Sequence, residues 1–289
     1  MKQVGIIGLG LIGGSLALAI RRARPGEFRV LGYTRTAANA EKASRMGIVD
    51  EVVDSPGSAV TGADLAIVAV PISATRDIFQ QIAGCLPSGC IVTDVCSTKT
   101  EVVKWAEECL PQDMSFVGGH PMAGREDSGI EAADVGLFDG CTYCLVLGER
   151  TSPESLQWMT DFVQGIGARP LVINPSEHDE FVAGVSHLPF FVAAALVSAT
   201  SGSSGWSQMS QLAAGGYRDT TRLASQNPQL GRDMCVTNQK NILWWIDNFS
   251  QELGRFREVI ATDPKAVEGM LMSARQAREQ WLDEHAEND

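Results

Sequence analysis

Positive charge is scarce in this 289-residue sequence, which has 23 Lys and Arg against 35 Asp and Glu and a formal net charge of −12. A broad nucleic-acid surface needs a basic face to neutralise phosphates, so we expect no nucleic-acid partner. The balance does not exclude a small anionic ligand, because one or two arginines can bind a carboxylate locally.

Long apolar runs are also missing. No stretch approaches the roughly 20 uninterrupted apolar residues that a membrane span needs, and the glycine-broken N-terminal segment is not a convincing signal peptide. The seven cysteines are odd in number and scattered, unlike a disulfide framework, and the pair Cys141 and Cys144 has no second pair or nearby His for zinc. We therefore expect a cytoplasmic protein without a membrane partner or a metal site.

The length suffices for about two domains, taking the usual ~150 residues each. In the first half, short β-rich apolar runs alternate with helix-length intervals, as a parallel α/β sheet covered on both faces requires. The predicted strands span residues 4–7, 30–33, 65–70, 91–95, 115–117 and 143–147. The pattern predicts an α/β domain over residues 1–173.

After about Ser176 the strand pattern stops, and an all-helical domain is predicted over residues 174–289. The expected helices span residues 177–199, 207–214 and 230–261, and Asp263 with Pro264 indicates the start of a last one. Apolar residues on the third helix recur at heptad-like spacing and form one seam: Ile242, Ile246, Phe249, Leu253, Phe256 and Ile260. A core-facing stripe explains this seam at least as well as a dimer interface.

A glycine-rich turn follows the first predicted strand and opens a helix; its residues are Gly8, Leu9, Gly10, Leu11, Ile12 and Gly13. Here Gly8 suits a tight turn, Gly10 permits close approach of a pyrophosphate, and Gly13 permits strand–helix packing. The helix N-terminus offers N–H groups to the phosphates. The motif predicts a dinucleotide cofactor, and we expect further cofactor contacts from Val70 and Pro71.

The second predicted strand is followed by Thr34, Arg35 and Thr36, where NAD enzymes place an acid on the ribose 2′-hydroxyl. A guanidinium flanked by two hydroxyls suits a 2′-phosphate, because Arg binds it bidentately. We therefore favour NADP over NAD. The alternative is that Arg35 stacks on the adenine or faces solvent.

Of the four histidines, His120 is best placed for chemistry. It lies in the segment GGHPMAG directly after a predicted strand, where a loop histidine faces a ligand and can act as a hydrogen-bond acceptor or base. His178 and His187 lie on the first helix of the second half. His178 is equally well explained as a capping or interface residue.

Five motifs follow one another along the chain: GLGLIGGSLA, TDVCSTKT, GGHPMAGRE, EHDEFVAGVSHLP and GGYRDTTRLAS. In this order, over about residues 3–262, the sequence resembles the prephenate/arogenate dehydrogenases of tyrosine biosynthesis. The resemblance implies a Rossmann-like N-terminal domain and a helical C-terminal dimerisation domain in a homodimer. It also implies NAD(P)-dependent oxidative decarboxylation, in which the substrate ring loses a hydride and CO2 and becomes aromatic.

The resemblance also implies residue roles. His120 matches the catalytic histidine that hydrogen-bonds the substrate 4-hydroxyl and draws its proton, and Ser97 matches the residue that contacts both that histidine and the nicotinamide side. Arg222 matches the arginine that holds a substrate carboxylate. The other implied substrate residues are His187 and Glu126, which line the pocket, and Asp219, which orients the basic groups.

Three departures from the family pattern bear on substrate choice. Phe190 stands where many prephenate-type enzymes have a second His after SHLP, and residues 227–231 stand where some members carry a Trp; both features look arogenate-like. Arg125 occupies a position that is usually Thr or Ser, where a cation can bind a substrate carboxylate or face water. Prephenate and arogenate both remain open as substrates.

Two other interpretations account for fewer of these residues. A β-hydroxyacid dehydrogenase or imine reductase shares the architecture, but the former places a catalytic Lys on its helical half. Beyond residue 104 the chain has only Lys240 and Lys265, and Lys240 has no glycine-rich partner motif. A non-catalytic NADP sensor would be favoured by loss of His120, Ser97 or Arg222, and all three are present.

Overall fold

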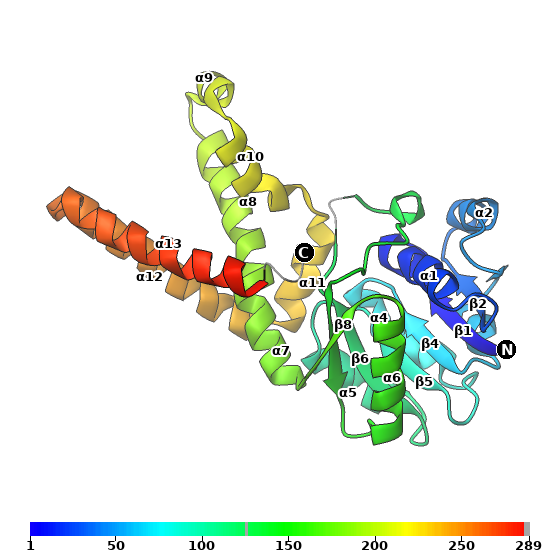
Figure 1. Cartoon of the computed structure of the whole chain (residues 1–289). Helices are drawn as coiled ribbons and strands as arrows, with labels where there is room; N and C mark the ends of the chain where they lie inside the picture. The colour runs from blue at the N-terminus through cyan, green and yellow to red at the C-terminus, as the bar shows by residue number, and fades with distance from the viewer. Residues whose placement is uncertain (125–126, 286–289) are drawn as a thin grey trace. The chain divides into compact units, whose positions relative to one another are not determined.

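The computed structural model describes residues 1–124 and 127–285 (Figure 1). The chain divides into two compact units, residues 1–239 and residues 240–289. The first unit contains a sheet, the helices that flank it and the helices that follow it up to residue 237. The second unit contains the long C-terminal helices.

An eight-stranded sheet forms the centre of the first unit, in the order β3-β2-β1-β4-β5-β6-β7-β8 (Figure 1). Neighbouring strands are parallel except β6 and β7. The strands are β1 (Lys2–Ile7), β2 (Phe28–Tyr33), β3 (Glu51–Val53), β4 (Leu65–Val68), β5 (Ile91–Asp94), β6 (Ser115–Pro121), β7 (Thr142–Leu147) and β8 (Arg169–Ile173). The predicted α/β class is confirmed. The sequence did not reveal β3, which is very short, or β8, which exposes Leu171 and Val172.

Helices cover both faces of this sheet, because successive residues of a strand point to opposite sides. In β1, Ile6 belongs to the core with residues of α1, α2 and α6, and Ile7 to the core with residues of α3, α4 and α5. The helices are α1 (Leu11–Ala23), α2 (Ala37–Met46), α3 (Pro56–Val60), α4 (Ile72–Ile82), α5 (Thr100–Cys109) and α6 (Pro153–Gly165). The carboxyl ends of β1, β4 and β5 consequently meet at one edge, which is where such sheets bind ligands.

The helical run predicted over residues 177–199 is present, with an irregularity in its middle. It consists of α7 (Pro175–Val182), a π-helical turn (Ala183–His187) and α8 (Leu188–Ser201). The next predicted helix, 207–214, is shorter and forms α9 (Trp206–Met209) and a 3-10 turn (Ser210–Leu212). The chain then continues through α10 (Gly215–Thr221), a 3-10 turn (Arg222–Ser225) and α11 (Pro228–Thr237).

The prediction of one long helix over residues 230–261 is wrong. The helix is divided at Asn238, whose φ of −136° and ψ of 29° leave the helical region. The Asn238 side-chain amide donates a 2.7 Å hydrogen bond to the backbone carbonyl of Asp179, which lies 59 positions earlier. A tertiary contact of this kind leaves no periodic trace in the sequence.

Two carboxylates from the helical segment cap helices of the α/β segment. Asp179 accepts hydrogen bonds from the backbone N–H groups of Lys99 (2.7 Å) and Thr100 (2.9 Å) at the start of α5. Asp233 accepts them from the N–H (3.2 Å) and hydroxyl (2.8 Å) of Ser73 in the first turn of α4. Negative charge is stabilising at a helix N-terminus. These contacts explain why the compact unit extends beyond the predicted boundary at 173/174 to residue 239.

One helical run, residues 175–201, is long and apolar enough to cross a membrane by length and composition. A core helix of a water-soluble protein meets the same criteria, so the run is weak support for a membrane span. Its apolar sequence is interrupted by His187 and Pro189. Phe181 and Val185 are 55% and 74% exposed, which leaves an apolar surface for another polypeptide to cover.

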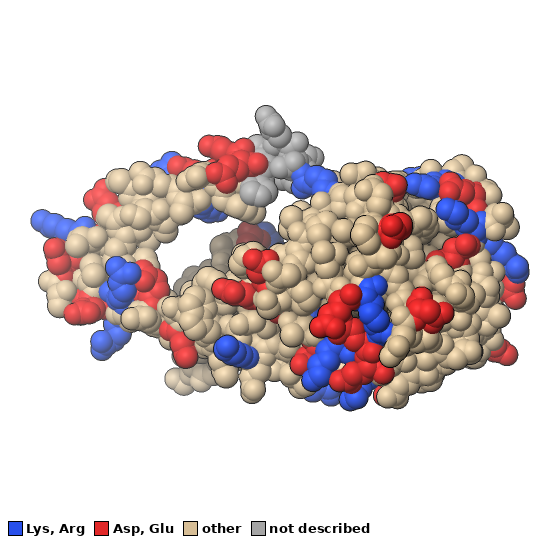
Figure 2. All heavy atoms as spheres, turned by 90° about the horizontal axis from the view of Figure 1, so that it is seen from below, with Lys and Arg blue, Asp and Glu red and all other residues tan. Residues whose placement is uncertain are grey.

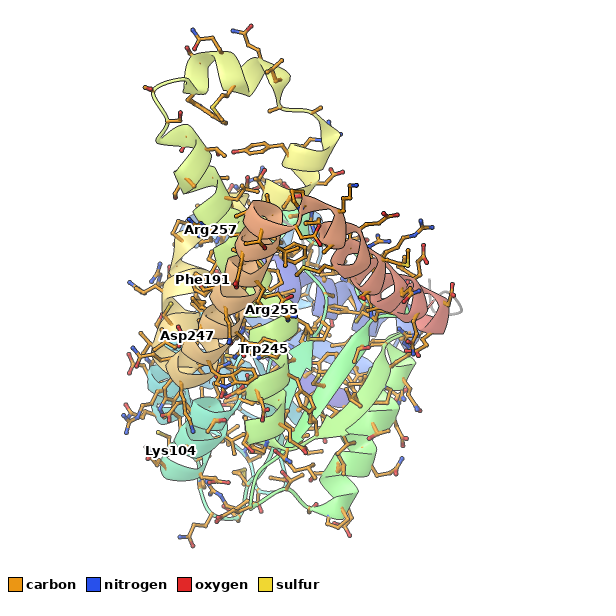
Figure 3. The ribbon with its side chains drawn as sticks, turned by 90° about the vertical axis from the view of Figure 1, so that its left-hand side faces the viewer. Lys104, Phe191, Trp245, Asp247, Arg255 and Arg257 are labelled. Carbon is orange, nitrogen blue, oxygen red and sulfur yellow. The ribbon has the colours of Figure 1, made fainter. Side chains whose placement is uncertain are left out.

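The second unit is formed mainly by α12 (Gln239–Thr262) and α13 (Val267–His285). Figure 3 shows Trp245, Asp247, Arg255 and Arg257 along α12. In the predicted seam, Leu253 and Ile260 are more than half exposed. The last helix begins later than predicted: Asp263 precedes a 3-10 turn (Pro264–Ala266) and its side chain makes no capping hydrogen bond.

Surface charge is mixed in sign. Figure 2 shows Lys and Arg lying close to Asp and Glu across one face of the molecule. Exposed ion pairs include Arg76 with Glu108, 2.9 Å apart, and Lys42 with Glu131, 2.7 Å apart. Acidic neighbours thus offset basic side chains locally, in keeping with the excess of acidic residues in the sequence.

Candidate active site

The glycine-rich turn between β1 and α1 has the shape of a pyrophosphate site. Gly8 has a φ of +104°, and a Cβ on Gly13 would lie 1.9 Å from the Gly8 carbonyl oxygen, so both glycines serve the fold. A Cβ on Gly10 would meet nothing within 4 Å. Gly10 is also the N-cap of α1, without a side-chain capping bond. Open space before uncapped N–H groups fits a dinucleotide phosphate.

The other predicted cofactor residues lie at the same edge of the sheet. The side chain of Val70 packs above Gly8, within 3.1 Å of an added Cβ, and Pro71 is the N-cap of α4. Leu9 is buried in the core, so its cofactor contact would come from its backbone. The half-buried side chains of the turn are Leu11 and Ile12.

The residues after β2 surround the expected ribose position. Gly8 donates a 2.8 Å backbone hydrogen bond to Tyr33, which brings the end of β2 beside the glycine turn. Arg35 is exposed and Thr34 half-buried. The hydroxyl of Thr36 caps α2 by accepting the N–H of Asn39 at 3.3 Å. Of the two hydroxyls that flank Arg35, one is therefore already engaged.

A buried ion pair organises the adjacent strand ends. The side chains of Lys99 and Asp94 are fully buried and in contact. Lys99 Nζ also donates to the Gly119 carbonyl at 2.6 Å, and Asp94 accepts the N–H groups of Gly119 (3.1 Å) and Cys96 (2.8 Å). The pair thus fixes the backbone next to both His120 and Ser97. Sequence reasoning missed it, although TDVCSTKT places an acid and a base around a strand end.

His120 lies in a strand, not in the predicted loop. β6 extends through Pro121, and His120 pairs with Cys144 of the antiparallel strand β7. The glycines before it allow close packing: a Cβ on Gly119 would lie 2.3 Å from the Asp94 carbonyl oxygen. Glycine and proline suggested a turn here, whereas the partner strand makes them part of the sheet.

His120 is joined to His178 and Asp179 in a hydrogen-bonded chain. The Nδ1 atom of His120 is 2.8 Å from Nε2 of His178, whose Nδ1 is 2.9 Å from a carboxylate oxygen of Asp179. All three side chains are buried. Burial, aided by the nearby charges of His178, Lys99 and His187, holds the pKa of His120 well below its usual value. A neutral imidazole backed by a carboxylate is suited to accept a proton.

Within the described residues, the buried atoms Ser97 Oγ and His187 Nε2 have no hydrogen-bond partner of good geometry, although the His187 ring lies close enough to the Ser97 backbone for that backbone to affect its pKa. Nδ1 of His187 lies 3.4 Å from the Asn238 side-chain nitrogen. Burial lowers the pKa of His187 to about 4, so the ring is neutral at physiological pH. Unsatisfied buried polar groups are rare and indicate a place that a ligand completes.

The chain matches two family models that together cover most of its length. The first, prephenate dehydrogenase, nucleotide-binding domain, matches residues 16–172, and the second, prephenate dehydrogenase, dimerization domain, matches residues 174–273. The prephenate dehydrogenase of Bacillus subtilis is 37% identical over 257 residues, which are 88% of this chain and 69% of that protein. The chain belongs to the prephenate dehydrogenase family.

Solved structures agree with this family membership. Arogenate dehydrogenase of Synechocystis is 31% identical, with a TM-score of 0.82 over 97% of this chain and all of that one. Prephenate dehydrogenase of Aquifex aeolicus, in complex with hydroxyphenyl propionate and NAD+, is 29% identical, with a TM-score of 0.88 over 98% of each chain. As a family member, this chain is a pyridine-nucleotide-dependent dehydrogenase.

The substrate residues predicted for this prephenate dehydrogenase family member are only partly brought together. Arg222 is exposed at the start of a 3-10 turn that packs against α8. Asp219 lies on the surface, with a carboxylate oxygen 3.7 Å from Nε of Arg218. Arg125 and Glu126 lie outside the described residues.

The two arogenate-like departures are in contact. Phe190 stacks edge to face on Phe191, with ring centroids 5.3 Å apart. A Cβ on Gly231 would lie 2.7 Å from the Phe190 ring, so α8 and α11 pack closely there. The two departures from the family pattern, Phe190 and the segment with Gly231, are therefore part of the same packing contact between α8 and α11.

Proposed function

We propose that this chain catalyses the oxidative decarboxylation of prephenate or arogenate, with NADP favoured over NAD, in tyrosine biosynthesis. The observation that carries the proposal is the buried His120 at the end of a hydrogen-bonded chain that begins at a carboxylate. Ser97 adds a buried hydroxyl for which the described residues offer no hydrogen-bond partner. A base and a hydroxyl at the carboxyl ends of β5 and β6 suit a substrate alcohol that loses hydride.

In the proposed mechanism, the bound nicotinamide supplies the hydride acceptor. His120 accepts a hydrogen bond from the substrate 4-hydroxyl and draws its proton, which raises electron density on oxygen and helps the C4–H pair leave as hydride. The electron pair of the bond to the departing carboxylate enters the ring, which becomes aromatic as CO2 leaves. The proton returns to the phenolic oxygen, so His120 finishes neutral and no proton is released.

Ser97 and His187 complete the proposed pocket. The Ser97 hydroxyl contacts the 4-hydroxyl and the nicotinamide side. The Asn238 side-chain nitrogen faces Nδ1 of His187, so we propose that Nε2 carries the ring proton as a donor close to the Ser97 backbone. We further propose that Arg222 holds a substrate carboxylate, with Arg125, Glu126 and Asp219 contributing at the pocket mouth.

Arg35 is the basis for favouring NADP. It follows β2 at the edge where the ribose would lie, and the residues around it include no acid to grip a 2′-hydroxyl. An exposed guanidinium there can bind a 2′-phosphate bidentately.

The function is tested by a steady-state assay of four pairs: prephenate or arogenate, each with NAD or NADP, followed by formation of reduced nicotinamide. We expect turnover, with NADP giving the higher kcat/KM. Higher kcat/KM with NAD would remove Arg35 from 2′-phosphate recognition. Binding of the cofactor with no turnover of either substrate would contradict the proposed activity and favour a sensor.

Replacing Gly10 by Ala should separate cofactor binding from folding. Its φ of −110° is open to any residue and a Cβ there meets no atom, so the variant should be as stable as wild type or gain about 0.4–1 kcal/mol. The methyl group would occupy the pyrophosphate space and raise the Kd of the cofactor. Titration calorimetry and thermal unfolding measure the two effects. In contrast, Gly13→Ala should unfold at lower temperature, because its Cβ collides with Gly8.

We also propose a homodimer, in the cytoplasm, in which residues 1–173 bind the cofactor and residues 174–289 provide the interface and part of the substrate pocket. The exposed apolar side chains of the run 175–201 and of α12 support this proposal. Covering such a surface with a second copy would remove it from water.

A further inference from the structure

We infer that His178 and Asp179 are positioning residues that fix which nitrogen of His120 carries the proton. This inference rests on the proposed role of His120 as the proton acceptor. The contacts that carry it are the 2.8 Å and 2.9 Å separations along the chain from His120 through His178 to Asp179.

The hydrogen bonds that link Asp179, His178 and His120 have a defined donor-to-acceptor direction, because one end of the series is a fixed carboxylate. Asp179 already accepts hydrogen bonds from the N–H groups of Lys99 and Thr100. Burial alone would raise the pKa of Asp179, but these hydrogen bonds and the one from His178 hold it below its usual value. An ionised carboxylate can only accept, so Nδ1 of His178 must carry a hydrogen and donate it.

The remaining proton positions follow from that donor. In neutral His178, Nε2 then has a lone pair, so Nδ1 of His120 must be the donor across their 2.8 Å contact. Neutral His120 consequently has its lone pair on Nε2, which is the atom left to accept the proton of the substrate hydroxyl. A single arrangement of hydrogens satisfies every contact in the chain.

The surrounding charged groups do not compete for these nitrogens. Lys99 is engaged by Asp94 and by the Gly119 carbonyl, and Nδ1 of His187 faces Asn238. Among the residues that the structure describes, these groups and Asp179 lie around the histidine pair from β5, the start of α5 and the helical run 175–201, and β7 adds the thiol of Cys144 opposite His120.

The test compares His178→Asn with wild type. Asn keeps a polar group toward Asp179 but does not reach His120. We expect kcat to fall about 10²-fold, the lower end of the usual contribution of a general acid–base group, with unchanged cofactor Kd. The acid limb of kcat/KM should move to higher pH, because His178 is one of the groups that lower the pKa of His120. An unchanged kcat and acid limb would overturn the inference, because a purely structural His178 would move neither.

A measurement on the wild-type enzyme covers the case in which the variant does not fold. With four histidines in the chain, the imidazole nitrogen NMR signals can be assigned with His285→Asn and His187→Asn. At neutral pH we expect His120 as the Nδ1–H form; the Nε2–H form would overturn the inference. His120→Asn, assayed in parallel, separates the two proposals: if that variant keeps full turnover, the role of His120 fails whatever the tautomer.

Discussion

Replacing His120 by Asn is expected to lower kcat by about 10²–10⁴-fold, the usual contribution of a general acid–base group. Asn retains a polar atom near the Nδ1 position, so the contact toward His178 can persist while the Nε2 acceptor is lost. Cofactor affinity should be unchanged, since the glycine turn after β1 is untouched. Stopped-flow or steady-state turnover and a cofactor titration measure both quantities. Near-normal turnover would exclude His120 from the chemistry.

The same histidine determines the expected pH dependence of the wild-type enzyme. Burial lowers the pKa of His120 well below 6.5, and a lowered pKa keeps the ring neutral as the pH falls. The acid limb of kcat/KM should therefore lie below pH 6.5, the value for an ordinary histidine. A limb above that value would mean that a different group, or the substrate, controls the profile.

Replacing Lys99 by Met is expected to destabilise the fold by about 3–5 kcal/mol, because it leaves the carboxylate of Asp94 buried without its cation. Both side chains are fully buried. The lost hydrogen bond to the Gly119 carbonyl adds to the effect and loosens the strand next to His120. Urea unfolding measures the stability change through the midpoint concentration.

Lys104→Met is the matched control, since Lys104 lies on the same helix, α5, and is exposed (Figure 3). It should change stability by less than about 0.5 kcal/mol. Adding Asp94→Leu to the Lys99 variant removes the unpaired charge but leaves the N–H groups of Gly119 and Cys96 without an acceptor. We expect the double variant to regain only part of the stability that Lys99→Met loses. Equal midpoints for the Lys99 and Lys104 variants would show that the pair is not stabilising.

The sequence was informative wherever burial was local and continuous. The segments 4–7 of β1 and 65–68 of β4 lack polar side chains because both faces of the sheet are covered there, and this pattern predicted the fold class correctly. The role of Gly10 could also be predicted, because a glycine is needed there for a reason visible in both sequence and structure: it leaves open space before a helix N-terminus.

Contacts between distant segments were the part that could not be predicted. His178 was interpreted as a capping or interface residue because its partner, His120, lies 58 positions earlier. The glycines of β6 also made the segment around His120 resemble a loop in the sequence. In the same way, Asn238 ended a helix through a bond to Asp179. The ion pair of Lys99 with Asp94 was close in sequence, yet only its complete burial reveals its importance.

The π-helical turn at residues 183–187 has a consequence for the angular phase of the helical run. His178 and His187 are separated by two and a half turns of a regular α-helix of 3.6 residues per turn, which would direct them to opposite sides. The wider turn accommodates an extra residue without completing the usual rotation. Both imidazoles are buried: His178 contacts Asp179, and His187 lies beside Asn238. Deleting one residue from this turn would leave the two histidines about 2.2 turns apart on a regular helix and so close to their present angular phase, whereas keeping all nine residues in a regular α-helix would turn them to opposite sides.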